Sequence, residues 1–188
     1  MSGRTLHQGA PAFCPSKPLS LIGFMATGKT TIGKLFSERH ALPFIDLDNE
    51  IEHREGKSIS EIFAMCGEEG FRKVEQEVLK EILNVAGSPD PYVLACGGGI
   101  ISSEENCLLL RERTICVHLD STFACCLERM SRKKEERPLA KFHGPEQLEK
   151  LYLTRMPLYQ SIALFHIDAT NEKESILATL TDAYFYPR

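Results

Sequence analysis

Short apolar runs alternate with longer segments of helical pattern along most of the chain. Each run predicts a buried strand, and the runs lie near residues 19–23, 43–46, 92–96, 115–119 and 164–168. Apolar residues recur at helical spacing between the runs, and a last helix is expected at residues 172–185. Strands that alternate with helices predict an α/β fold, in which helices cover both faces of a parallel sheet.

A phosphate-binding motif follows the first of these runs. The sequence Gly23-Phe-Met-Ala-Thr-Gly-Lys-Thr30 matches the pattern G-x-x-x-x-G-K-[ST], and residues 31–40 continue it with a helical pattern. Glycines let backbone N–H groups surround phosphate oxygens, and the N-terminus of a helix favours negative charge. The motif predicts a nucleoside triphosphate site, with Lys29 on the β- and γ-phosphates and Thr30 on Mg²⁺.

Composition limits the size of the protein and its partners. The 188 residues, 43% of them hydrophobic, fit one compact domain at residues 18–188 after a flexible tail at residues 1–17. A net charge of −4 argues against nucleic acid as the main partner. No apolar stretch reaches the roughly 18 residues of a membrane span, so no membrane partner is expected. The seven cysteines form no C-x-x-C pair, and reduced thiols in the cytoplasm are expected.

Two polar patterns predict helix starts, and one charged segment stands outside the strand–helix alternation. Ser58 is followed by Glu61, and Ser102 by Glu105, at the spacing of a capping box. Residues 131–143 are strongly charged and contain a proline, and they are expected to form a mobile lid.

Two carboxylates, Asp46 and Asp48, lie at the C-terminal end of the second strand. Open α/β sheets bind ligands at that edge. If the strand continues through both residues, their side chains share one direction, because side chains alternate along a strand. One carboxylate would then assist Mg²⁺ and the other would face the acceptor. The alternative is that Asp48 caps the following helix.

Arg72 and Glu75 lie three residues apart at the start of a long helix that is expected to run from residue 67 to about residue 86. At this spacing they share a face, so the carboxylate can hold the guanidinium in one orientation. A fixed guanidinium suits the bidentate capture of a ligand carboxylate. An ordinary surface ion pair is the alternative.

The segment Gly97-Gly98-Gly99 and the side chain of Arg155 complete the acceptor pattern. Three glycines after a strand permit close backbone approach to a ligand and expose N–H donors, and a flexible turn is the alternative. Pro157 is expected to bend the helix around it and direct Arg155 inward. Two arginines, two aspartates and three glycines together describe an acceptor that carries one carboxylate and several hydroxyls.

This ordered set of motifs resembles the shikimate kinase family from about Leu19 onward. The matching residues are the phosphate loop, Asp46-x-Asp48, Phe71-Arg72-x-Val-Glu75, Gly97-Gly98-Gly99, Arg137-Pro138-Leu139 and Arg155-x-Pro157-Leu158-Tyr159. The resemblance implies a three-layer P-loop fold like that of nucleoside monophosphate kinases. Its five parallel strands would have the order 2-3-1-4-5, with a lid and a substrate-binding region at about residues 47–80. It also implies transfer of the γ-phosphoryl group of ATP to the 3-hydroxyl of shikimate, in aromatic amino-acid biosynthesis, by a monomer.

The resemblance implies a role for each matched residue. Shikimate would be held by Asp48, Arg72, Gly97, Gly98, Gly99 and Arg155, with Glu75 supporting Arg72. ATP would be bound by Gly23, Ala26, Thr27, Gly28, Lys29, Thr30, Thr31 and Arg137, and one Mg²⁺ ion by Thr30 and Asp46. The catalytic residues would be Lys29, Asp48 and Arg137. The arginine that stacks on adenine would be Arg129 or Arg132, and Ala26 stands where many relatives carry glycine.

Two other functions share the phosphate loop. A kinase for gluconate or for a nucleoside monophosphate would need other roles for Asp48, Arg72 and Arg155. A non-catalytic nucleotide-binding switch would need neither these two arginines nor Arg137.

Overall fold

The five predicted strands form one parallel sheet in the computed structural model, which describes residues 15–84, 91–132 and 144–186. The strands are β1 (Leu19–Ile22), β2 (Phe44–Asp46), β3 (Val93–Ala95), β4 (Ile115–Asp120) and β5 (Phe165–Asp168). Their order in the sheet is β2-β3-β1-β4-β5. The predicted order is therefore confirmed, and each predicted strand agrees with the structure to within one residue at either end.

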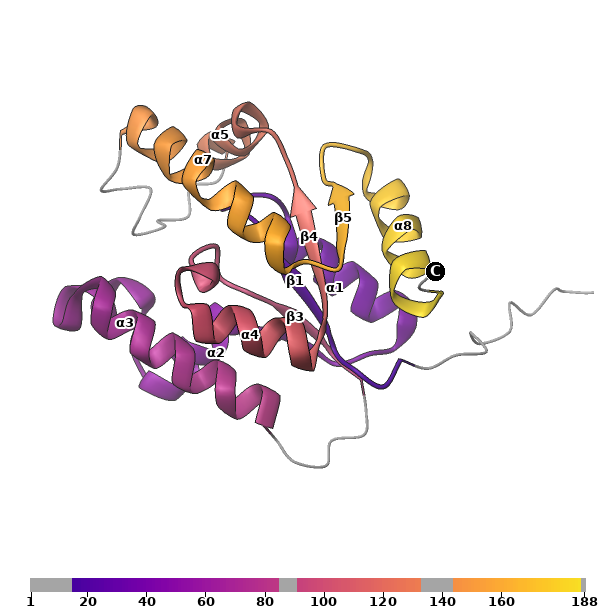
Figure 1. The fold of residues 1–188 in the computed structure, drawn as a ribbon. Coiled ribbons are helices and arrows are strands. Elements are labelled where there is room, and N and C mark those ends of the chain that lie inside the picture. The colour runs from indigo at the N-terminus through magenta and orange to yellow at the C-terminus, as the bar shows by residue number, and fades with distance from the viewer. Residues whose placement is uncertain (1–14, 85–90, 133–143, 187–188) are drawn as a thin grey trace, which may run out of the picture.

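Helices cover both faces of this sheet. They are α1 (Lys29–His40), α2 (Leu47–Glu55), α3 (Ile59–Asn84), α4 (Glu104–Arg113), α5 (Phe123–Arg132), α7 (Pro145–Ile162) and α8 (Lys173–Phe185), with a short 3₁₀ helix η1 (Ile100–Ser102) before α4. Figure 1 shows α8 beside β5, α4 and α7 in front of the sheet, and α2 and α3 on the side of the molecule away from α8. The three-layer arrangement expected from the sequence is confirmed.

Alternation along the strands divides the core into two parts. Leu19 and Leu21 of β1 pack with α1 and α8, where Phe36 is fully buried. The next residue, Ile22, packs on the other face with residues of α2, α3, α4 and α7. Side chains on a strand point alternately to the two faces, so one short apolar run serves both cores. Each fully buried aliphatic or aromatic side chain contributes about 1.5–3 kcal/mol to stability.

One predicted capping box is confirmed and the other is wrong by one residue. Glu61 accepts hydrogen bonds from the backbone N–H and the hydroxyl of Ser58, at 2.8 and 2.7 Å, and its own N–H donates to the Ser58 hydroxyl. Ser103, not Ser102, caps α4, and its hydroxyl oxygen accepts from the N–H of Asn106 at 3.3 Å. The chain forms the turn η1 through Ser102, and this turn moves the helix start by one residue.

Helix α3 has a break at Gly67, the residue at which the long helix was expected to begin. Gly67 has φ 69° and ψ −174°, a conformation that glycine adopts readily because it has no Cβ. The segment before the break starts at the cap of Ser58, and the segment after it continues to Asn84. Residues 85 and 86 lie outside the described residues. The second segment carries Arg72 and Glu75.

Two expected segments fall largely outside the described residues. Of the expected tail at residues 1–17 only residues 15–17 are described, and there the Lys17 carbonyl accepts a hydrogen bond from Tyr184 at 2.9 Å. The expected lid at residues 131–143 is described only at residues 131 and 132, so Arg137 lies outside as well. In the part of the chain that the structure describes, no helix is long and apolar enough to cross a membrane.

Candidate active site

The phosphate loop joins β1 to α1, and its backbone has a conformation that requires glycine at two positions. Gly23 and Gly28 have φ values of 148° and 102°, and Gly28 is the residue before α1. Lys29 is 7% exposed, and its Nζ donates to the carbonyl oxygens of Gly23 and Phe24 at 2.8 Å each. The loop therefore holds its lysine beside the helix N-terminus, where backbone N–H groups attract anions.

Ala26 is in the left-handed region with φ 61°. A residue with a Cβ is strained there by about 1 kcal/mol, whereas glycine is not. A glycine at this position would relieve the strain. The alanine here keeps the same backbone path and lines the cavity described next.

A cavity of about 320 Å³ lies at the carboxyl ends of the strands. Its lining consists of Ala26, Thr27, Gly28, Lys29, Thr30, Thr31, Ile32, Asp46, Asp48, Cys96, Gly97, Gly98, Arg129, Arg132, Ala169, Asn171, Lys173 and Ile176. Most of the residues expected to bind ATP therefore surround one space, together with both aspartates and two of the three glycines. Gly23, Arg72, Gly99 and Arg155 are not part of this lining.

The two aspartates lie in different elements, Asp46 at the end of β2 and Asp48 in α2, so the strand does not continue through both. Strand β2 ends at Asp46, and Leu47 begins α2. Asp46 caps this helix by accepting from the N–H groups of Asp48 and Asn49, and its Oδ2 also accepts from the hydroxyl of Thr30 at 2.8 Å. The interpretation of Asp48 as the cap is thus wrong. Asp48 lies in the first turn of α2 and lines the cavity.

Arg72 and Glu75 form a buried ion pair rather than a surface one. The Nη1 of Arg72 lies 2.8 Å from Glu75 Oε2, and the Glu75 side chain is only 1% exposed. Burial raises the pKa of the Glu75 carboxyl, and the Arg72 charge opposes this. Burial lowers the pKa of Arg72, but the carboxylates of Glu75 and Glu68 more than offset it, so the net shift is upward. The guanidinium therefore stays charged and held from two sides, with Glu68 at 3.1 Å.

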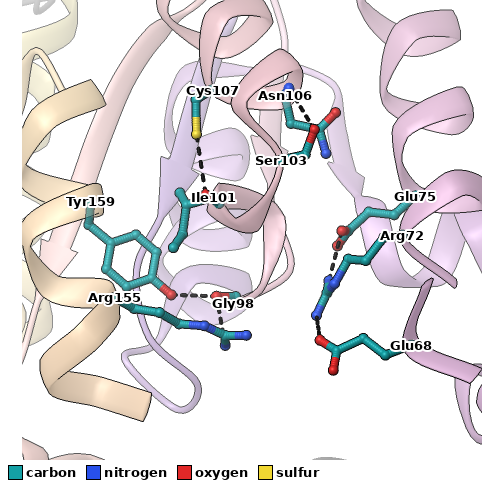
Figure 2. Close-up of polar contacts among 10 residues, drawn as sticks. All are labelled: Glu68, Arg72, Glu75, Gly98, Ile101, Ser103, Asn106, Cys107, Arg155 and Tyr159. Carbon is teal, nitrogen blue, oxygen red and sulfur yellow. Dashed lines mark hydrogen bonds and ion pairs between the residues drawn. The ribbon is translucent and has the colours of Figure 1, made fainter. Parts of the chain in front are cut away.

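Arg155 of α7 is directed inward, as expected, and is 5% exposed. Its Nη1 donates to the carbonyl oxygen of Gly98 at 3.2 Å. Figure 2 shows its guanidinium and that of Arg72 extending toward each other from opposite sides of the site. Burial lowers the pKa of Arg155, and the Arg72 charge lowers it further. Among the described residues no carboxylate forms an ion pair with Arg155, and an anionic ligand would supply the missing charge.

Each glycine of Gly97-Gly98-Gly99 lies where a side chain would meet the site. A Cβ at Gly97 would lie 2.8 Å from Asp48 Oδ1 and 3.0 Å from Glu75 Oε1. At Gly98 it would lie 3.3 Å from the backbone nitrogen of Met25, in the phosphate loop. At Gly99 it would overlap the guanidinium of Arg72. The segment therefore brings Asp48, Arg72 and the phosphate loop close together.

A Gly99→Ala substitution should displace Arg72 without straining the backbone, since φ at Gly99 is −99°. We expect it to raise the KM for the acceptor about tenfold or more, because a shift of a few tenths of an ångström to one ångström weakens a bidentate contact. Steady-state kinetics would measure this, with Gly144→Ala as the control, where a Cβ meets nothing within 4 Å. An unchanged acceptor KM would contradict the placement of Arg72.

Three contacts of the site were not predicted from the sequence. Glu68 is a second partner of Arg72, one turn before it on α3. The guanidinium of Arg129 donates to the carbonyls of Thr27 and Ala169 at 3.2 and 2.7 Å, whereas Arg132 pairs with Glu128 at an exposed position. The third is the contact of Tyr159 with Gly98. The spacing of four residues from Arg155 indicates that both side chains share one helix face, but it does not identify Gly98 as their partner.

Comparison with known proteins agrees with this geometry. The family model for shikimate kinase matches residues 25–184. A shikimate kinase from Dictyoglomus turgidum is 41% identical, over 82% of this chain and 88% of that protein. One from Staphylococcus epidermidis is 38% identical, over 85% and 90%. The solved structure of a shikimate kinase from Acinetobacter baumannii in complex with shikimate has a TM-score of 0.80 at 36% identity, covering 88% of this chain and 91% of that one. The chain therefore belongs to the shikimate kinase family.

Proposed function

We propose that this protein transfers the γ-phosphoryl group of ATP to the 3-hydroxyl of shikimate, giving shikimate 3-phosphate and ADP, in aromatic amino-acid biosynthesis. The observation that carries the proposal is the pair of largely buried guanidiniums, Arg72 and Arg155, on either side of Gly98 and next to the phosphate loop. A nucleoside monophosphate has no carboxylate that would give both guanidiniums a shared role. Shikimate and gluconate each combine one carboxylate with several hydroxyls, and the match to the shikimate kinase family favours shikimate.

Shikimate is placed with its carboxylate between Arg72 and Arg155. Both guanidiniums are held in place, by Glu75 and Glu68 in one case and by the Gly98 carbonyl in the other, so little ordering remains to be done on binding. The hydroxyls then face Asp48 and the backbone of Gly97-Gly98-Gly99, which a Cβ would block.

ATP is placed with its phosphates in the loop from Gly23 to Thr31. Thr30 and Asp46 would hold Mg²⁺, since a hydroxyl and a carboxylate 2.8 Å apart are the hard oxygen donors that this ion prefers. Bound there, Mg²⁺ would neutralise part of the charge on the β- and γ-phosphates.

A Thr30→Val variant tests the metal placement. We expect the Mg²⁺ concentration for half-maximal rate to rise about tenfold, because one oxygen ligand is lost while the shape of the side chain is kept. Rates measured across a magnesium titration at saturating shikimate would show it. Thr179→Val is the control, because that hydroxyl is exposed on α8, donates to the Ser175 carbonyl and does not line the cavity. An equal rise in both variants would contradict the role of Thr30.

The reaction forms a bond between the shikimate 3-oxygen and the γ-phosphorus and breaks the bond from that phosphorus to the β–γ bridging oxygen. The transition state is loose, so alignment and charge stabilisation supply most of the catalysis. On ATP binding, the ammonium group of Lys29 would release the carbonyl oxygens of Gly23 and Phe24 and donate hydrogen bonds to γ-phosphate oxygens instead. Asp48 orients the hydroxyl and receives its proton. Arg137, outside the described residues, would come from the lid to the transferring phosphoryl group.

We place the reaction in the cytoplasm and expect a monomer. ATP is available in the cytoplasm and thiols stay reduced there, and the six described cysteines are unpaired. One chain supplies all residues assigned to the site.

Ligand-induced stabilisation tests the proposed acceptor without turnover. Shikimate at about 100 times its Kd should stabilise the protein by about 2.7 kcal/mol, which raises the Tm by roughly 5–10 °C in a domain of this size. Gluconate at the same concentration should leave the Tm unchanged. A shift with gluconate and none with shikimate would overturn the proposal.

A further inference from the structure

Tyr159 of α7 contacts the acceptor side of the site from a fully buried position. Its hydroxyl donates to the carbonyl oxygen of Gly98, the same atom that accepts from Arg155 (Figure 2). We infer that Tyr159 is a positioning residue for shikimate, which acts by fixing the Gly98 peptide and, through it, the guanidinium of Arg155. This inference rests on the proposed function, because it concerns the carboxylate that Arg155 would bind.

The ring of Tyr159 has one orientation, set by its packing. It stacks on the ring of His118 in β4, with centroids 5.1 Å apart and planes at 17°. His118 is 1% exposed, and burial lowers its pKa to about 4, so it packs as a neutral ring at pH 7. Burial also raises the pKa of Tyr159, and the charge of Arg155 opposes this only in part. The phenol therefore stays protonated at pH 7. The hydroxyl is therefore a permanent donor at a fixed place.

Gly98 connects this donor to both halves of the site. Its carbonyl oxygen has two lone pairs, and among the described residues Tyr159 and Arg155 donate hydrogen bonds to it. A Cβ at Gly98 would lie 3.3 Å from the Met25 nitrogen and 3.6 Å from the Gly23 carbonyl, so the peptide lies against the phosphate loop. Fixing this peptide sets where Arg155 ends relative to the transferring phosphoryl group.

If the Tyr159 hydroxyl is removed, only one of these two hydrogen bonds to the Gly98 carbonyl remains, the one from Arg155. The guanidinium and the peptide could then move together, and Arg155 would have to be ordered by the substrate. A buried hydrogen bond contributes about tenfold to an equilibrium at the upper end of its net range. We therefore expect shikimate binding to weaken by about that factor, while ATP binding changes little, because the Thr27 hydroxyl and the Arg129 guanidinium hydrogen-bond the phosphate loop independently of Gly98.

The test is Tyr159→Phe, which removes the hydroxyl and keeps the ring stacked on His118. The expected result is a shikimate KM about tenfold higher, with the KM for Mg·ATP within about twofold and kcat within about threefold. Calorimetric titration with shikimate alone should show the same loss in Kd. The matched control is Tyr152→Phe on the same helix, whose hydroxyl donates to the Ser121 carbonyl at 3.0 Å.

A structural role alone would lower the Tm of Tyr159→Phe and leave both KM values unchanged, which would overturn the inference. Equal increases in both KM values, or the same increase in Tyr152→Phe, would overturn it as well. If the parent enzyme turns over shikimate and the KM values of Tyr159→Phe equal those of the parent, the inference alone is refuted. A parent that does not accept shikimate refutes the proposed function and the inference together.

Discussion

Replacing Arg155 by alanine should raise the KM for shikimate about 100-fold and leave the KM for Mg·ATP within about threefold. The guanidinium is buried and already oriented by the Gly98 carbonyl, so its full contribution goes to the ligand carboxylate. Removing one partner of a buried, hydrogen-bonded charge pair costs about 2–5 kcal/mol, which is a factor of about 30 or more. Steady-state kinetics with each substrate varied in turn would measure both KM values.

Arg72→Ala should have the same selective effect and a second one on stability. It leaves Glu75 buried with no guanidinium beside it, and an uncompensated buried charge costs roughly 3 kcal/mol or more unless it takes up a proton. Arg39→Ala is the control, because that arginine pairs with Glu174 at an exposed position away from the site. Equal loss of ATP binding in the Arg72 and Arg155 variants would contradict their assignment to the acceptor.

Replacing Lys29 by alanine should lower kcat about 1,000-fold. The ammonium group is the loop's own positive side chain, held by the Gly23 and Phe24 carbonyls until phosphate oxygens replace them. Charge stabilisation of this kind is worth roughly 100- to 1,000-fold per preorganised donor, and a full charge lies at the upper end. Single-turnover measurement of phosphoryl transfer at saturating ATP and shikimate would separate this effect from binding.

Lys34→Ala is the matched control for Lys29. It lies on the same helix but is exposed, with its ammonium 5.9 Å from the ring centroid of Phe44. A Lys29 variant that transfers phosphate as fast as Lys34→Ala would contradict the catalytic role of the loop lysine.

The sheet was predictable because its central strands are buried on both faces. Leu19 to Ile22 is an unbroken buried run, and such runs between helical patterns carry a strong signal in sequence. The ion pair of Arg72 with Glu75 was predictable for a similar reason, because helical periodicity alone brings residues three apart together. Whether the pair was buried depended on packing from distant parts of the chain, and sequence left that open.

The conditional strand through Asp46 and Asp48, the alternative cap at Asp48 and the predicted cap at Ser102 failed for one reason. Each depends on the residue at which an element ends, and boundaries are set by local hydrogen bonds that composition does not determine. The turn η1 after the three glycines includes Ser102, so Ser103 caps α4 instead. Helix α2 starts at Leu47, so Asp46 and not Asp48 is its cap. Tyr159 was missed because its partner, Gly98, is 61 residues away. The roles of all these residues in binding and catalysis stay predictions.

The central claim is that this chain phosphorylates shikimate. The direct measurement is ADP release with Mg·ATP in a coupled assay, offering shikimate, gluconate and a panel of nucleoside monophosphates separately, beside a reaction without acceptor. We predict turnover with shikimate alone, and no ADP release above background in the other reactions. Turnover with gluconate or a nucleotide instead would contradict the roles of Asp48, Arg72 and Arg155, and ADP release that is the same without any acceptor would contradict the claim altogether.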